Sequence, residues 1–139
     1  MNRNVEVSLG DIIQVDGNDR EVVGISRYTS PVLNWVVLEL KPPRGKTRTS
    51  ILKMYGRCYE VEKTEKSEQE LQEEGFRAAQ EGEAQMALVG SSESDVSDCE
   101  FTYFRADENT IAMVVNSRQG EETLIGTRME EGRVDTDPE

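Results

Sequence analysis

Short runs of β-branched and aromatic residues, separated by turn residues, recur at spacings of about 8–12 residues along this chain. In the first run, NVEVSL, the apolar residues Val5, Val7 and Leu9 alternate with polar ones. The next two runs, DIIQV and REVVGI, flank the turn sequence Asp16-Gly17, which favours a β-hairpin because both residue types tolerate positive φ. A chain patterned in this way is predicted to form mainly antiparallel β-strands.

The apolar run from Val32 to Leu40 is predicted to be a central strand, because it is too apolar for an exposed sheet edge. It contains Trp35, the single tryptophan, which we expect to find in the core. Pro42 and Pro43 then interrupt the pattern, since proline cannot donate a hydrogen bond to a β-ladder. Further strands are expected at SILKMY and RCYEVEK, joined by a turn at Gly56.

A stretch rich in Glu, Gln, Lys and Ala follows, and its composition predicts a helix. Ser67 and Glu70 have the spacing of a capping box, so we expect the helix to run from about Glu68 to Gln80. Gly75 weakens this helix by about 1 kcal/mol relative to alanine. The apolar stripe is thin, which is typical of a surface helix or a connector.

Strands are expected to resume at AQMALVG, CEFTYFRA, TIAMVVNSR and ETLIGTRM, with a hairpin turn at DEN. We therefore predict a single, mainly antiparallel β domain over residues 1–139, built from curved sheets or small barrels with one connecting helix. Its two β-rich halves span about 5–62 and 84–135, and the acidic helical connector spans about 65–82.

The balance of charge argues against several kinds of partner. The 139 residues include 28 acidic and 16 basic ones, for a formal net charge of −12 at pH 7. Nucleic acids and anionic membranes are negative themselves, so we expect no direct nucleic-acid binding.

There is no secretory signal and no apolar run of membrane-spanning length, so we expect no membrane insertion and a cytoplasmic location. Cys58 and Cys99 are then expected to be reduced thiols, buried or half-buried.

Few residues in the sequence suit catalysis. The chain has no histidine, which removes the commonest general base and the commonest zinc ligand. Nucleophile-elbow, P-loop and dinucleotide-binding motifs are absent as well. We therefore expect no cofactor, no metal site and no catalytic residues. The 28 acidic residues nevertheless leave a carboxylate- or metal-dependent hydrolase open as an alternative.

The most uneven feature is a basic segment, residues 41–57, which holds six basic residues and no acidic one. On an otherwise acidic chain, this segment suits contact with a phosphate, a polyanion, a protein partner or the acidic face of a second copy. A simpler interpretation is that its cations only offset repulsion on the surface. The candidate binding residues are Arg44, Lys46, Arg48, Lys53 and Arg57.

Several short motifs of the chain match a known family. They are Leu9-Gly10-Asp11, Val22-Val23-Gly24 and the strand from Trp35 to Leu40, and then EGEAQMALVG, FTYFRADENTIAMVV and ETLIGTRMEEGRV. On these pieces, which cover about residues 7–135, the chain resembles the uncharacterised, prokaryotic domain-of-unknown-function family 4178. The basic proline loop and the long acidic helical stretch depart from the family's pattern.

The resemblance implies a β-rich fold and supplies no catalytic residues. Members of this family look like companions of membrane-associated or polyamine-enzyme-like genes, which implies an accessory role in a multi-component system. We accordingly expect a non-enzymatic interaction module, an adaptor or accessory subunit that contacts a protein partner or a second copy. The hydrolase is one alternative, and an acidic mimic of nucleic acid is the other.

Overall fold

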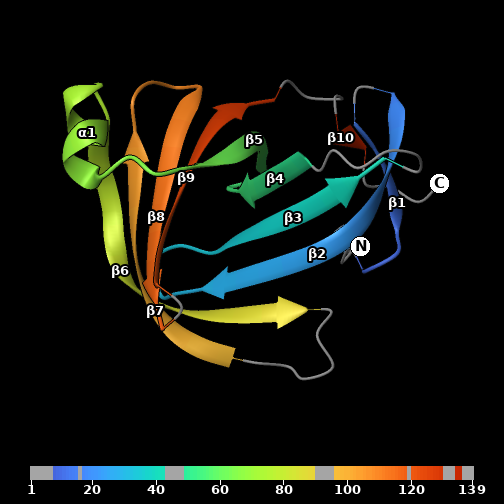
Figure 1. Ribbon diagram of the computed structural model, residues 1–139. Coiled ribbons are helices and arrows are strands. Elements are labelled where there is room, and N and C mark those ends of the chain that lie inside the picture. The colour runs from blue at the N-terminus through green and yellow to red at the C-terminus, as the bar shows by residue number, and fades with distance from the viewer. Residues whose placement is uncertain are drawn as a thin grey trace.

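The computed structural model describes residues 8–15, 17–42, 49–89, 96–118, 120–129 and 134–135. The predicted mainly antiparallel β fold with one connecting helix is confirmed (Figure 1). The elements are β1 (Ile12–Val15), β2 (Asn18–Thr29), β3 (Trp35–Lys41), β4 (Thr49–Met54), β5 (Arg57–Thr64), α1 (Glu68–Glu73), β6 (Arg77–Val89), β7 (Val96–Arg105), β8 (Thr110–Ser117), β9 (Gly120–Arg128) and β10 (Val134–Asp135).

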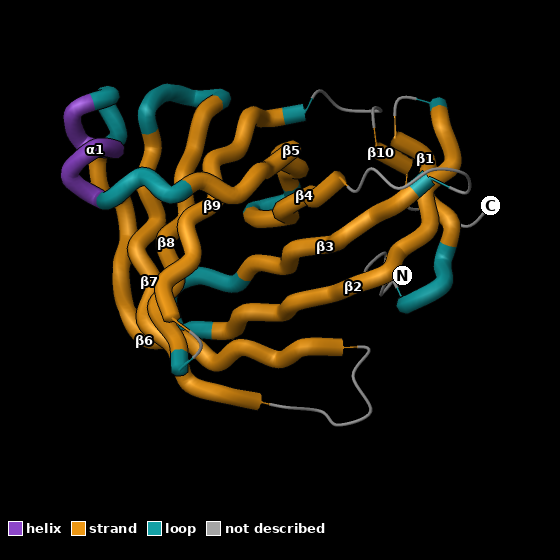
Figure 2. Tube along the Cα trace, viewed as in Figure 1, coloured by secondary structure: helices purple, strands orange, loops and turns teal. Residues whose placement is uncertain are grey.

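Eight of these strands form a closed antiparallel barrel, in the order β2-β3-β4-β5-β9-β8-β7-β6. Pairing of β6 with β2 closes it, from Ile25 opposite Val89 to Thr29 opposite Gln85. The two β-rich halves of the sequence therefore contribute to one barrel, which Figure 2 shows as a continuous wall of strands. The predicted central strand, β3, is paired on both sides, with β2 and with β4.

Strand β2 is long because it pairs with two different strands, one after the other, along the same edge. Its first residues, 18–21, pair with β1, and its last residues, 25–29, pair with β6. A shift in register between Val22 and Gly24 separates the two regions, as expected for a β-bulge that bends a strand. The β1–β2 hairpin agrees with the turn predicted at Asp16-Gly17, although Asp16 itself lies outside the described residues. Most of the first predicted strand, NVEVSL, also lies outside them.

The helix is shorter than the sequence predicts. The capping box is present, since the Ser67 hydroxyl accepts from the Glu70 backbone and the Glu70 carboxylate accepts from Ser67 N–H. The prediction of a helix as far as Gln80 is wrong, because α1 ends at Glu73 and Gly75 turns the chain with a φ of 100°. The connector predicted over about 65–82 is shorter for the same reason, since β6 already begins at Arg77.

Three apolar clusters hold these elements together. The largest fills the barrel and contains Trp35, Tyr59, Phe101 and Met113. A second lies outside β2–β4, where β1 and Met129 pack over the strands. A third lies outside β7–β9, where Leu71 of α1 and Phe76 cover residues of the barrel wall. In both of these outer regions, a neighbouring segment therefore covers the apolar residues of the barrel wall.

Gly126 is required by the tight packing inside the barrel. A Cβ atom at this position would lie 2.5 Å from Val61 Cγ1 and 3.3 Å from the Glu60 carbonyl oxygen. We expect Gly126→Ala to lower the free energy of unfolding by about 1–3 kcal/mol, because β5 must shift to accept the methyl group. Urea denaturation measures the effect.

Gly82→Ala is the matched control. Its added Cβ would meet Phe101 at 3.6 Å, an ordinary contact, so we expect a change in stability of less than about 1 kcal/mol. Equal losses of unfolding free energy in the two variants would contradict the conclusion that Gly126 has no room for a side chain.

Candidate functional site

The structure divides the predicted basic segment. Arg44, Lys46 and Arg48 lie outside the described residues. Lys53 pairs with Cys58 on the outer face of the barrel, whereas Arg57 pairs with Met54, whose side chain belongs to the cluster inside the barrel. Because side chains alternate between faces along a strand, Lys53 and Arg57 are close in sequence but do not share one face.

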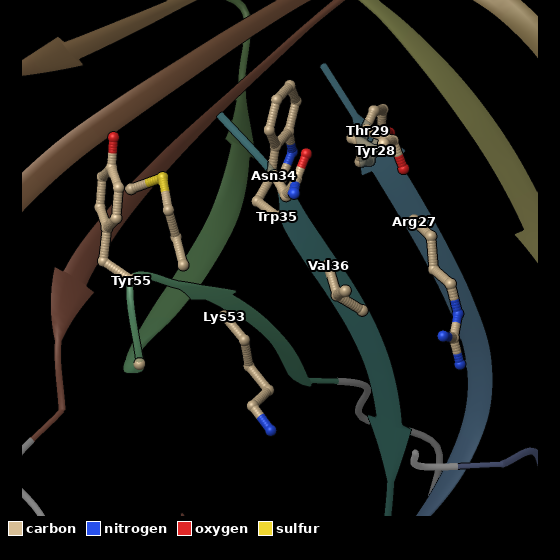
Figure 3. Close-up of a pocket in the computed structure, with 10 residues that line it drawn as sticks. Arg27, Tyr28, Thr29, Asn34, Trp35, Val36, Lys53 and Tyr55 are labelled. Atoms are coloured by element: carbon tan, nitrogen blue, oxygen red, sulfur yellow. The ribbon is translucent and has the colours of Figure 1, made fainter. Parts of the chain in front are cut away.

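Lys53 instead shares a cleft with a residue that the sequence did not indicate. Arg27, Val36 and Lys53 are direct neighbours across β2, β3 and β4, so the valine lies between two cations. The cleft at this row has a volume of about 320 Å³ (Figure 3). In Figure 3 the Arg27, Val36 and Lys53 side chains extend from their strands on the same side of the wall. We call this site the basic cleft; its lining is Arg27, Tyr28, Thr29, Asn34, Trp35, Val36, Lys53, Met54, Tyr55 and Gly56.

The floor of the basic cleft rests on a stack of aromatic rings. Tyr28 and Trp35 lie parallel, with centroids 4.6 Å apart and an interplanar angle of 6°. Phe101 meets the indole in an edge-on arrangement, at a centroid distance of 4.9 Å. The core position predicted for Trp35 is confirmed by its exposure of only 2%. This stack fixes the ends of β2 and β3 and therefore the positions of the cationic side chains above them.

The indole N–H of Trp35 is buried and has no hydrogen-bond partner in the described part of the chain. A buried donor without a partner costs about 1–3 kcal/mol. The barrel therefore tolerates a polar atom that its described residues do not satisfy, on a residue that lines the basic cleft.

The electrostatic character of the basic cleft follows from its lining. Of the described residues that line it, two are cationic and none is acidic. Burial raises the pKa of Tyr28 to about 12, and the Glu122 carboxylate adds to this shift, so the phenol is neutral at physiological pH. The two cationic side chains can therefore supply positive charge to a negative group.

Both cysteines are free thiols, half-buried at Cys58 and buried at Cys99, as the sequence predicts. Cys58 lies beside the basic cleft, and burial raises its pKa although the Lys53 ammonium opposes the shift. Since the thiolate is the nucleophile, a raised pKa makes this thiol less reactive at neutral pH.

A second hollow, of about 470 Å³, lies over β6 and β7 and is acidic. Glu81, Glu83 and Glu100 line it together with Glu68 of α1, and Glu83 is paired directly with Glu100. The hydrolase and the nucleic-acid mimic would both depend on such a surface. Within the described ranges, no three acidic or thiol groups are close enough together to hold a metal ion.

Arg27 is the functional candidate that sequence reasoning missed. It stands alone in the stretch ISRYTS, without neighbouring cations, and no motif marks it. Only the register of β2 with β3 and of β3 with β4 brings it into one row with Lys53.

Comparisons with protein-family models, with curated proteins and with solved structures find no match to this chain. The resemblance to family 4178 stays a prediction. Among the residues that the structure describes, no helix is long and apolar enough to span a membrane.

The raised pKa of Tyr28 makes stability depend on pH. An unfolded tyrosine loses its proton near pH 10.0, whereas folded Tyr28 keeps its proton until about pH 12. The folded state therefore loses stability as the pH rises between these values, because only the unfolded state gains the favourable ionisation. We expect Tyr28→Phe to flatten this part of the stability profile, measured by urea denaturation from pH 9 to pH 12.

The same experiment on Tyr55→Phe is the control. Tyr55 is 64% exposed, so removal of its hydroxyl should change the slope much less than removal of the Tyr28 hydroxyl does. A slope that is unaffected by Tyr28→Phe would contradict the placement of the Tyr28 hydroxyl in a buried site.

Proposed function

We propose that this chain is a non-enzymatic interaction module, an adaptor or accessory subunit of a cytosolic multi-component system. It binds an acidic segment of a protein partner in the basic cleft. The observation that carries the proposal is the row of Arg27, Val36 and Lys53 across three strands, in a cleft whose described lining residues include no acid.

The chemistry of the row suits a short peptide with both acidic and apolar side chains. Arginine and lysine pair with carboxylates, and the partly buried Val36 between them offers an apolar contact. Three neighbouring strands hold these side chains, so less conformational entropy is lost on binding than at a flexible loop.

The net charge of the chain supports the choice of an acidic partner site. With a formal charge of −12, most of the surface repels a negative partner. An acidic segment is then attracted mainly where cations gather, which selects one orientation of approach. The accessory role that the resemblance to family 4178 implies is consistent with a protein partner.

The test uses a fluorescein-labelled oligoglutamate peptide that contains leucine. We expect the wild-type protein to bind it with an affinity that falls as salt is added. Lys53→Glu should weaken binding about tenfold or more, because it replaces an attractive charge with a repulsive one. Fluorescence anisotropy measures the dissociation constant.

Arg118→Glu is the matched control, since it makes the same charge change at an exposed position between β8 and β9. It should leave the affinity within about twofold of wild type, as expected for a salt-screened charge outside the cleft lining. Equal weakening by the two variants, or no binding by the wild-type protein, would refute a specific role for the basic cleft.

A further inference from the structure

Four arginines come together by register at one end of the barrel. They are Arg57 of β5, Arg77 of β6, Arg105 of β7 and Arg128 of β9, and we call them the arginine mouth. In Figure 1 the β7–β8 turn and the arrowhead of β9 both lie at the upper end of the barrel. These residues are separate from the lining of the basic cleft.

Strand register places each of these arginines on the inner face of the wall. Residues directly opposite each other on neighbouring strands point to the same face. Arg57 is opposite Met54 and Arg128 is opposite Tyr59, and both partners are buried inside the barrel.

The same rule places the other two arginines, on β6 and β7, on the inner face. Arg105 is opposite Ile111, which belongs to the cluster inside the barrel, and Arg77 is opposite Arg105. The first residues of β5 and β6 and the last residues of β7 and β9 are thus arginines at inward-facing positions.

The barrel beneath the arginine mouth is filled. Tyr59, Phe101, Ile111 and Met113 are at most 2% exposed and pack against one another in one cluster. A ligand at this end would therefore rest on the rim and could not enter the barrel, so the rim arginines would be its principal contacts.

Tyr103 lies near two of these arginines, Arg105 of its own strand and Arg57 of β5. Burial raises the pKa of its hydroxyl, Tyr59 and Tyr55 act in the same direction, and the Arg105 and Arg57 guanidinium groups oppose the shift. These residues must therefore lie within electrostatic reach of one hydroxyl, which stays protonated and able to donate a hydrogen bond at neutral pH.

Among the described residues, the four guanidinium groups form no ion pair. In the same part of the chain, Lys63 pairs with Glu122 and Lys66 pairs with Glu74. The β7–β8 turn carries Asp107 and Glu108 near Arg105, but the Asp107 carboxylate accepts a hydrogen bond from the Asn109 backbone. Unpaired like charges at one rim repel each other, and a bound anion would relieve that repulsion.

We propose that the arginine mouth binds a compact small-molecule anion that carries several negative charges. Guanidinium groups suit such a ligand because each can donate two parallel hydrogen bonds to a phosphate or a carboxylate. Phosphate and carboxylate sources share this chemistry, and tripolyphosphate and citrate distinguish them.

The experiment is isothermal titration calorimetry of the full chain with tripolyphosphate and, separately, with citrate at physiological salt. We expect one site per chain for at least one anion, with a dissociation constant below about 1 mM. The double variant Arg57→Ala/Arg105→Ala should weaken binding about tenfold or more, since two charge-assisted contacts are lost. Tighter binding of tripolyphosphate would indicate a phosphate ligand, and tighter binding of citrate would indicate a carboxylate ligand.

Arg118→Ala and Lys53→Gln are the controls, and both should bind the anion as the wild-type protein does. Arg57→Lys/Arg105→Lys keeps the charge but loses the paired donors, so an intermediate affinity is expected. Circular dichroism tests whether each variant is folded. If the alanine double variant is unfolded, the affinity of the lysine double variant decides the outcome.

Absence of binding by the wild-type protein, or equal weakening in Arg118→Ala, would overturn the proposal. Because the oligoglutamate test depends on Lys53 and the anion test depends on Arg57 and Arg105, each site can fail without the other.

Discussion

The pairing of β2 with β6 is the interaction on which the rest of the structure depends. It joins the first β-rich half of the chain to the second and converts a ten-stranded sheet into a closed barrel. Without it, two strands would present unpaired edges, and the apolar interior would be open to water. Tyr28 lies within the pairing itself and stacks on Trp35, which meets Phe101 from the other half. The closure and the aromatic stack therefore support each other.

Barrel closure also decides where positive charge gathers on a chain with a net charge of −12. On the outer face, the aligned strands β2, β3 and β4 bring Arg27 and Lys53 to either side of Val36. On the inner face, the ends of other strands bring arginines together at one rim. The two proposed sites thus use opposite faces of the same wall, and the alternation of side chains keeps them apart.

Much of the fold could be predicted from local pattern. The β1–β2 hairpin, the paired central strand and the turn at Gly56 all follow from apolar alternation and turn residues, which act over a few residues. The helix was overpredicted because composition and a capping box mark a helix start but not its end. Gly75 reverses the chain there, and pairing with β7 holds the residues that follow in β6. Tertiary pairing overrode local helix propensity in that segment.

By itself, the sequence determined the strands, their turns and the buried place of Trp35, because these depend on residue type and short spacing. It also marked a basic segment, but it could not show that Lys53 and Arg57 face opposite ways. Only the tertiary structure decided that the halves form one barrel and that Arg27 joins Lys53. The physical reason is that strand register sets which side chains become neighbours, and register between distant strands depends on how the whole core packs.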